Sequence, residues 1–153
     1  MMTDSKNSNA QQLAEAVVAK MLEKDAFSRW LGLCVTELAP GRAVCRMTVR
    51  DEMLNGFLRA HGGIAYSLAD SALAFAANTC GRVTVSIENV ANYPAPVVAG
   101  DELEACAEEQ SAGRRIALYN VNVRKSDGTL VCAFRGTVYR TDKEFFPDGD
   151  RPN

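Results

Sequence analysis

The chain has 153 residues, of which 47% are hydrophobic and 24% are charged, as in an ordinary globular domain. Its formal net charge of −2 argues against a nucleic-acid partner, and no apolar run is long enough to cross a membrane. We therefore expect one domain over residues 11–142, with a disordered N-terminus over residues 1–10 and a C-terminal tail over residues 143–153.

The cysteines and the first residues predict a reducing location. The N-terminus lacks the apolar core of a secretory signal peptide. The five cysteines are odd in number, and none has C-x-x-C spacing: Cys34, Cys45, Cys80, Cys106 and Cys132. All but Cys80 fall in strand-like runs, where a cysteine usually acts as a small buried hydrophobe. We expect a cytoplasmic protein with reduced thiols.

The first part of the chain combines helical and strand-like patterns. Apolar spacing and the turn signal Ala39-Pro40-Gly41 predict a helix over 11–24, a short helical turn over 25–31, and strands over 32–38 and 42–49. A connection then leads to a long apolar helix over 61–80, with Gly81 as its C-terminal cap residue.

The second part of the chain contains only strand-like runs. Turn signals separate four of them, over 83–93, 101–109, 115–124 and 129–141. Because no helix lies between these runs, parallel crossovers are excluded and the sheet should be antiparallel. A helix that is apolar all round is best buried when about six strands curl around it. The predicted class is therefore α+β, with the hotdog arrangement, in which one sheet face or edge typically needs a second copy.

Asp70 is the most informative residue of the central helix, because no other charge occurs between His61 and Arg82. A carboxylate in such apolar surroundings is desolvated, which raises its pKa unless hydrogen-bond donors face it. At the start of the same helix, the glycine pair Gly62-Gly63 leaves backbone N–H groups accessible. Together these features predict an acyl-transfer site, with a carbonyl polarised at the helix N-terminus and a carboxylate that attacks it or activates water.

The spacing of these groups predicts a site that is shared between two chains. Gly63 and Asp70 are seven residues apart, which corresponds to about 10.5 Å along an α-helix. A reacting atom must come within about 3 Å, so one chain cannot easily close the gap. Two antiparallel copies of the helix would bring Gly63 of one chain opposite Asp70 of the other.

Each of these residues also has a purely structural interpretation. Asp70 can be a hydrogen-bonded core carboxylate beside two serines, and the glycine pair can serve close helix packing. Asn55-Gly56 is by default a turn, although the Asn55 amide can also hold the attacking water or the thioester. His61 is the only histidine, so we expect it to order the start of the helix rather than to transfer protons or bind metal. Cys80 has no neighbouring base and is expected to be inert.

A combination of motifs resembles the hotdog-fold acyl-CoA thioesterases of the phenylacetate-degradation (PaaI) type. The matching segments are Met53-Leu54-Asn55-Gly56, His61-Gly62-Gly63, Leu68-Ala69-Asp70-Ser71-Ala72, Ala77-Asn78-Thr79-Cys80-Gly81, Asn92-Tyr93-Pro94-Ala95-Pro96 and Ala99-Gly100-Asp101. The resemblance covers most of residues 30–140, and the spacing N-G-x(4)-H-G-G-x(4)-L-A-D is far more specific than any of its parts.

The resemblance implies a homotetramer of hotdog dimers that hydrolyses acyl-CoA, with no metal and no cofactor other than the coenzyme A of the substrate. It gives Asp70 the role of nucleophile or general base, and it assigns the oxyanion N–H to Gly63 of the other protomer. Asn55 would contact the thioester or the water, with His61 beside it as a further candidate. Four residues are candidates for substrate binding: Gly62, Ser86 (or Thr84 in its place), Phe57 and Tyr66. Basic residues suited by charge to the coenzyme A phosphates are Arg114, Arg115, Arg124 and Lys125.

The predicted substrate is phenylacetyl-CoA or hydroxyphenylacetyl-CoA, although the sequence does not identify the acyl group. One alternative is a hotdog sensor that binds acyl-CoA without cleaving it. A sensor that regulates transcription needs a DNA-reading helix pair, which a single helix before Gly32 does not supply. Another alternative is a hotdog dehydratase, but that chemistry requires a histidine paired with an acid, and His61 lies in the glycine motif instead.

Overall fold

The computed structural model describes the backbone of residues 2–147 and the side chains of residues 7–147; Met1 and the part of the predicted tail over 148–153 lie outside these residues. The elements, in chain order, are α1 (Met2–Leu22), α2 (Ala26–Leu31), β1 (Cys34–Ala39), β2 (Arg42–Thr48), η1 (Asp51–Met53), α3 (Gly62–Asn78), β3 (Arg82–Asn92), β4 (Glu102–Ala112), β5 (Ile116–Lys125) and β6 (Leu130–Glu144).

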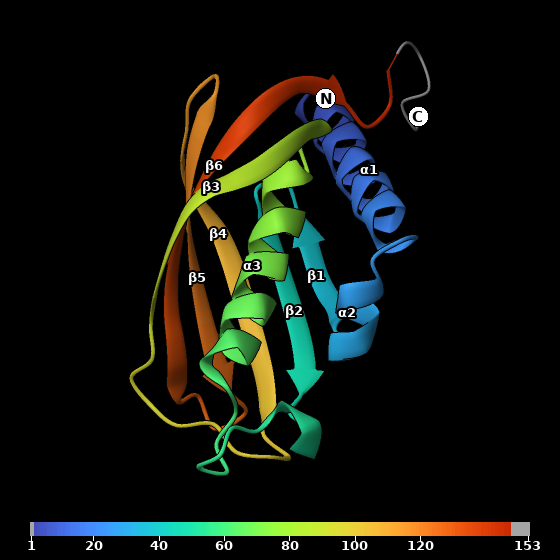
Figure 1. The fold of residues 1–153 in the computed structure, drawn as a ribbon. Coiled ribbons are helices and arrows are strands. Elements are labelled where there is room, and N and C mark those ends of the chain that lie inside the picture. The colour runs from blue at the N-terminus through green and yellow to red at the C-terminus, as the bar shows by residue number, and fades with distance from the viewer. Residues whose placement is uncertain (1, 148–153) are drawn as a thin grey trace.

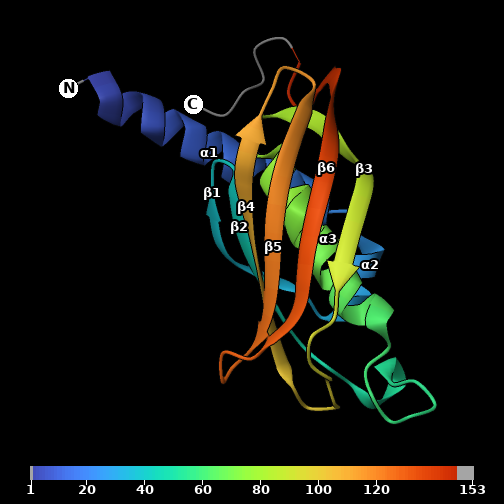
Figure 2. The same cartoon turned by 90° about the vertical axis from the view of Figure 1, so that its left-hand side faces the viewer.

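The six strands form one antiparallel sheet in the order β1-β2-β4-β5-β6-β3. The sheet curls around α3, which lies along its inner face (Figures 1 and 2). This arrangement confirms the predicted hotdog fold. The two edges of the sheet are β1 and β3, and β3 enters the sheet by pairing with the last strand of the chain, β6.

Helix α3 packs against strands β2 to β6 and supplies much of the core. One set of its apolar side chains is buried: Ile64, Ala65, Leu68, Ala69, Ala72, Leu73, Phe75, Ala76 and Ala77. A second stripe, at spacings of three and four residues, is only half-buried: Tyr66, Ser67, Asp70, Ser71 and Ala74. The helix is therefore not enclosed on all sides within one chain, and the uncovered stripe includes Asp70.

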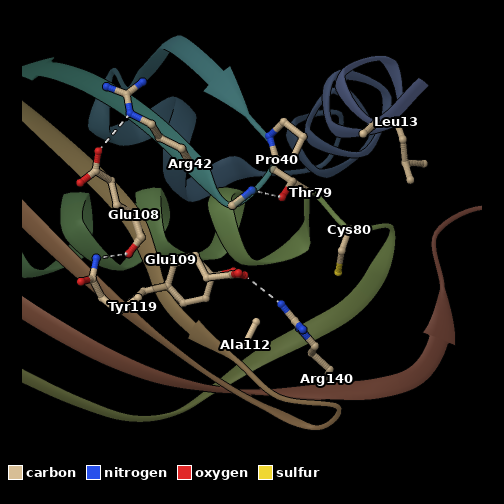
Figure 3. A pocket seen from close by; sticks show the side chains of 13 residues that line it. Leu13, Pro40, Arg42, Thr79, Cys80, Glu108, Glu109, Ala112, Tyr119 and Arg140 are labelled. Atoms are coloured by element: carbon tan, nitrogen blue, oxygen red, sulfur yellow. Dashed lines mark hydrogen bonds and ion pairs between the residues drawn. The ribbon is translucent and has the colours of Figure 1, made fainter. Parts of the chain in front are cut away.

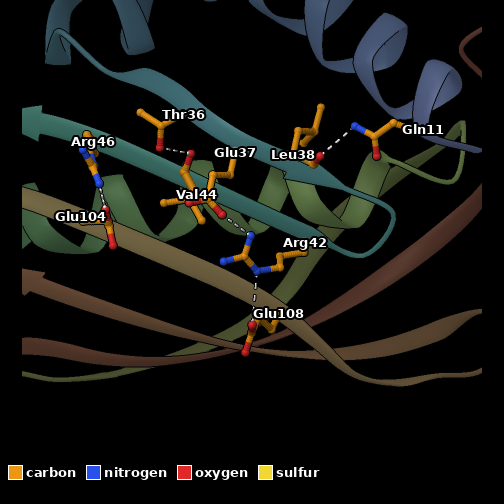
Figure 4. A network of polar contacts seen from close by, with 9 residues as sticks. All are labelled: Gln11, Thr36, Glu37, Leu38, Arg42, Val44, Arg46, Glu104 and Glu108. Atoms are coloured by element: carbon orange, nitrogen blue, oxygen red, sulfur yellow. Dashed lines mark hydrogen bonds and ion pairs between the residues drawn. The ribbon is translucent and has the colours of Figure 1, made fainter.

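Helix α1 packs on β1 and on α3 at the end of the fold where α3 terminates. Ala14 and Val17 are completely buried there, and the Gln11 side-chain amide donates a hydrogen bond to the Leu38 carbonyl over 2.8 Å (Figure 4). The helix begins at Met2, whereas the sequence predicts disorder over residues 1–10. Once the packed part of a helix exists, each further residue adds one hydrogen bond, so a polar stretch can extend it without core contacts.

The outer face of the sheet carries cross-strand ion pairs near β1 and β2. Arg42 bridges Glu37 at 2.6 Å and Glu108 at 3.3 Å, and Arg46 pairs with Glu104 at 2.6 Å (Figure 4). These pairs are solvent-exposed, so each contributes little to stability, but together they cover β2 with charge.

The central helix ends earlier than predicted: its last residue is Asn78 rather than Cys80, and its C-cap residue is Thr79 rather than Gly81. Gly81 has a φ of +86° and donates its N–H to the Asn78 carbonyl over 2.9 Å. Among the described residues, no helix is long and apolar enough to span a membrane. All five cysteines are free thiols; Cys45 and Cys132 are buried, and Cys34 and Cys80 are exposed.

Candidate active site

Asp70 lies halfway along α3 and borders a cleft of about 240 Å³. The cleft lies between the uncovered stripe of α3 and the start of the edge strand β3, and its other lining residues are Leu73, Ala74, Ala77, Thr84, Val85, Ser86 and Val138. Burial raises the pKa of the Asp70 carboxyl group, and a hydrogen bond from Asn89 partly opposes this effect. The cleft therefore holds one partly desolvated carboxyl group among uncharged neighbours.

Asn89 connects Asp70 to two of the predicted binding residues. Its side-chain nitrogen donates to Asp70 Oδ1 and to the Tyr66 hydroxyl, each over 3.1 Å. Its side-chain oxygen accepts a hydrogen bond from the Ser86 hydroxyl over 2.7 Å. Asp70, Tyr66 and Ser86 thus form one network. The alternative candidate, Thr84, is buried, and its hydroxyl donates to the Arg82 carbonyl instead.

Sequence reasoning missed Asn89, although a signal was present. Asparagine is depleted in β-strands, and Asn89 stands inside the otherwise β-rich run over 83–93. The alternation of the run does not reveal which way this amide points. An asparagine inside a strand that packs beside the helix with the buried carboxylate is the pattern that would have identified it.

At the start of α3, the accessible backbone amide is not the one that the sequence predicts. His61 is the N-cap residue, and its Nδ1 accepts a hydrogen bond from the Gly63 N–H over 3.0 Å. The Ile64 N–H donates to the His61 carbonyl over 2.9 Å. Within the described part of the chain, the Gly62 N–H has no hydrogen-bond partner and borders a cleft of about 290 Å³. Gly62, rather than Gly63, therefore presents a free donor at the positive end of the helix.

His61 has the structural role that the sequence favours, because its side chain caps the start of α3 by accepting the Gly63 N–H. A Cβ on Gly63 would lie 3.1 Å from His61 Nδ1, so the absence of a side chain at this position makes room for the capping imidazole. A Cβ on Gly62 would meet nothing closer than Tyr93, at 3.6 Å.

The loop that precedes α3 contains Asn55 and Phe57. Asn55 Oδ1 accepts hydrogen bonds from the backbone N–H groups of Phe57 and Arg59, over 2.9 and 3.3 Å. The side-chain oxygen of Asn55 thus stabilises the turn, as the structural interpretation expects. Among the described residues, the side-chain nitrogen of Asn55 has no hydrogen-bond partner. Phe57 is 85% exposed at the tip of this loop and lines neither the Asp70 cleft nor the Gly62 cleft.

The two clefts are separate within one chain. Gly62 and Asp70 occupy the same continuous helix, eight residues apart, which corresponds to about 12 Å of helix. The Asp70 cleft adjoins Thr84 to Ser86 at the start of β3, whereas the Gly62 cleft adjoins Tyr93, directly after the end of β3. The two clefts therefore lie at different levels of the same edge strand, and the Asp70 carboxylate itself is hydrogen-bonded to Asn89 between them.

A larger cavity, of about 770 Å³, lies elsewhere, beyond the C-terminal end of α3 (Figure 3). Its charged side chains pair with one another: Arg140 contacts Glu109 at 3.0 Å, and Glu109 also accepts a hydrogen bond from Tyr119 over 2.8 Å. Burial, followed by the neighbouring Glu109, raises the pKa of the Tyr119 phenol. None of the predicted site residues lines this cavity, so size alone does not identify the reactive site.

Two of the predicted phosphate-binding residues are engaged within the chain. Arg115 pairs with Asp142 at 2.7 Å, and Lys125 pairs with Asp101 at 2.8 Å. Arg124 is exposed and donates to the Gly128 carbonyl over 2.9 Å. Among the predicted basic residues, Arg115 and Lys125 would have to leave carboxylate partners to meet a phosphate.

Comparison with known proteins assigns the family. Residues 59–132 match the model of the Thioesterase superfamily. The acyl-coenzyme A thioesterase PaaI of Escherichia coli is 36% identical over 120 residues, which cover 78% of this chain and 86% of that protein. Human acyl-coenzyme A thioesterase 13 is 30% identical over 136 residues, or 86% of this chain and 96% of that protein.

The solved structure of E. coli PaaI superposes with a TM-score of 0.86 at 33% identity, covering 88% of this chain and 97% of that chain. A variant of PaaI from Thermus thermophilus gives a TM-score of 0.74 at 45% identity, covering 76% of this chain and all of that one. This chain belongs to the hotdog-fold thioesterases of the PaaI type, within the Thioesterase superfamily.

Proposed function

We propose that this protein hydrolyses an acyl-CoA thioester to a free acid and coenzyme A, with Asp70 as nucleophile or general base. The observation that carries the proposal is the Asp70 carboxyl group, which borders a cleft, is partly desolvated and has one oxygen engaged by Asn89. The family membership supports thioester chemistry at this site. No cofactor is required beyond the coenzyme A of the substrate.

The proposed reaction begins with an ionised Asp70. Either a carboxylate oxygen attacks the thioester carbonyl carbon and forms an anhydride, or it takes a proton from a water molecule that attacks in its place. In both routes the carbon–sulfur bond breaks, and the coenzyme A thiolate leaves and is protonated by the proton that water supplies. In the first route a water molecule then hydrolyses the anhydride, which releases the free acid and restores the Asp70 carboxylate. The negative carbonyl oxygen of the intermediate needs a donor, and the free Gly62 N–H at the helix start supplies the right chemistry. We therefore assign the oxyanion donor to Gly62 rather than to Gly63, whose N–H is occupied by His61.

We further propose that each site combines the Asp70 cleft of one chain with the Gly62 cleft of a second copy. Strand β3 pairs with β6 on one side and, among the described residues, forms an edge of the sheet on the other. Two of its apolar side chains, Val85 and Ile87, are 47% and 57% exposed. Such an edge is suited to pairing with another strand. If two copies of β3 pair antiparallel, the start of one strand meets the end of the other, which brings the two kinds of cleft together. The half-buried stripe of α3 would be covered by the same contact.

The remaining parts of this proposal concern assembly and location. A dimer of such dimers, the homotetramer that the resemblance implies, is compatible with the open outer face of the sheet, where Leu118 and Tyr139 are 40% and 37% exposed. The free, partly exposed thiols of Cys34 and Cys80 suit the reducing cytoplasm.

Phenylacetyl-CoA and hydroxyphenylacetyl-CoA are the first substrates to test. Tyr66 packs edge-to-face on Phe134 with ring centroids 5.2 Å apart, and the Tyr66 hydroxyl belongs to the Asp70 network. Phe134 is buried, so the half-buried Tyr66 ring supplies the apolar surface near the carboxylate that an aryl group can contact. The names of the PaaI relatives point to the same substrate class.

The test is the release of free thiol from a panel of aryl and aliphatic acyl-CoA esters. We expect Asp70→Asn to lower kcat by about 10²- to 10⁴-fold, as for the loss of a general base. Asp127→Asn makes the same chemical change in an exposed turn and should retain full activity. Full turnover by Asp70→Asn would overturn the assignment of Asp70. Tight binding of acyl-CoA by the native protein without any release of thiol would instead favour the non-catalytic sensor.

A further inference from the structure

Asn89 is held in one orientation by its three hydrogen bonds. Both hydrogens of its side-chain amide are used, one on Asp70 Oδ1 and one on the Tyr66 hydroxyl, and its oxygen accepts from Ser86. If the amide were rotated by 180°, its oxygen would face the Asp70 carboxylate, and two acceptors would repel each other. The chemistry of the neighbours thus specifies which end of the amide meets Asp70.

A local irregularity of the sheet directs Asn89 toward α3. The pairing of β3 with β6 shifts by one residue between Ser86 and Glu88, which is a β-bulge. Ser86 lies on the inner side of the sheet, and in a regular strand the inward positions would continue at 88 and 90. The bulge changes this parity, so that Asn89 rather than Glu88 faces Asp70.

Gly136 on β6 provides the space that the Asn89 side chain needs. It pairs directly with Asn89, and a Cβ at this position would clash with the Leu73 side chain and lie 3.0 Å from Asn89 Oδ1. Glycine in a strand interior generally weakens the strand, and it is commonly found where another group approaches the backbone closely. The bulge and the glycine therefore serve the same contact.

We propose that Asn89 is a positioning residue for the thioesterase reaction, which fixes the plane of the Asp70 carboxylate and leaves its second oxygen to react. The inference rests on the function proposed above, because it concerns how Asp70 is held and not whether Asp70 acts. Among the described residues, Asp70 Oδ2 accepts no hydrogen bond, so it is the oxygen available to the thioester or to water. Ser86 and Tyr66 then help to position Asp70 through their hydrogen bonds with Asn89.

The same hydrogen bond stabilises the ionised form of Asp70, and this gives the proposal a pH signature. Burial raises the pKa of Asp70, while the Asn89 hydrogen bond lowers it, so that loss of the amide should raise it further. The titratable group on α3 that faces Asp70 is the Tyr66 phenol, which is linked through Asn89. The residues of β3 and β6 that line the cleft are uncharged: Thr84, Val85, Ser86 and Val138. No neighbouring charge is therefore expected to mask the effect.

The experiment compares Asn89→Ala and Asn89→Asp with the native enzyme over a range of pH. We expect Asn89→Ala to lower kcat by about 10- to 100-fold, as for a misplaced reactive group, with little change in KM. The acid limb of the kcat/KM profile should move to higher pH. In Asn89→Asp a second carboxylate replaces the donor close to Asp70, so the acid limb should move further in the same direction.

Asn120→Ala is the matched control, because it removes an exposed amide from the outer face of β5. It should leave kcat and the pH profile unchanged. If Asn89→Ala does not fold, Asn89→Asp preserves the size of the side chain and the acceptor for Ser86, and it gives the same readout. Native kcat and an unmoved acid limb in an Asn89 variant would overturn this inference, even if Asp70→Asn is inactive. Activity in Asp70→Asn itself would instead refute the proposed function.

Discussion

A site shared between two copies can be tested by combining two inactive chains. One chain carries Asp70→Asn and the other carries Gly62→Pro, which deletes the proposed oxyanion donor. Gly62 is the first residue of α3, where proline is well tolerated, and the preceding His61 has the extended backbone (φ −56°, ψ 137°) that proline requires. A Cβ at Gly62 would lie no closer than 3.6 Å to Tyr93, so this position has room for a side chain.

The expected activities follow from the arrangement. Alone, the Gly62→Pro dimer should lose about 10²- to 10³-fold in kcat and the Asp70→Asn dimer about 10²- to 10⁴-fold. In a mixed dimer, one site combines the native Gly62 of one chain with the native Asp70 of the other, and the second site combines both substitutions. The mixed dimer should therefore recover about half of the native activity per dimer, since one of its two symmetry-related sites is intact.

The assay is thiol release by mixed dimers that are isolated through two different affinity tags, after light scattering has established the mass of the assembly. A reciprocal control pairs a native chain with a chain that carries both substitutions. A shared site predicts almost no activity for this control, because each of its sites lacks one group, whereas a site within one chain predicts about half. Mixed dimers as inactive as their parents, together with a half-active control, would refute the shared site. Gly62→Ala, which retains the N–H, should remain active.

Three further predictions concern stability and assembly. Asp70→Asn should raise Tm at pH 7, because burial raises the pKa of Asp70 and the folded state therefore disfavours the ionised form. Calorimetry should show the higher Tm at pH values above the folded-state pKa of Asp70, and no difference in Tm at pH values low enough to protonate Asp70 in the folded and unfolded states. A difference in Tm that does not change with pH would contradict this explanation. His61→Ala should cost about 1 kcal/mol through loss of the cap on the Gly63 N–H, whereas His61→Asn should restore both stability and turnover; an inactive but stable His61→Asn would indicate a chemical role. Ile87→Lys should leave the chain folded but disrupt the contact at β3, so that light scattering gives a smaller assembly and thiol release is lost, with Asp127→Lys in an exposed turn as the active control; full activity in an assembly that lacks the β3 contact would exclude the shared site.

Much of the fold could be predicted because the patterns that specify it are local. The apolar run around Asp70 predicts a central helix, and the succession of strands without helices between them predicts an antiparallel sheet. The N-terminal boundary was harder to predict, because a polar helical extension has no periodicity that distinguishes it from a disordered segment. Fold class and helix position thus follow from hydrophobic pattern, whereas the start of α1 lies in a polar stretch that this pattern does not describe.

The site was less predictable, and Gly62 and Asn89 illustrate why. Which of two adjacent glycines presents a free N–H depends on the side-chain conformation of His61, and a motif does not contain this information. Whether Asn89 faces the helix depends on a bulge one residue wide, which reverses the inward and outward positions of the strand after it. Both determinants are displacements of about one residue, which hydrophobic periodicity does not resolve.

The β-bulge and the proposed pairing edge lie on the same structural element. The bulge that turns Asn89 toward Asp70 lies within β3, and β3 is also the open edge at which a second chain is proposed to pair. Bulges increase the local twist of a strand, so the irregularity that orients the carboxylate also shapes the surface that receives the partner. A change at the bulge should therefore affect the geometry of Asp70 and the assembly together, whereas a change at Asn89 alone should affect only the former. Comparing the two kinds of variant therefore distinguishes the positioning of the Asp70 carboxylate from the approach of the partner's Gly62 N–H, although both depend on β3.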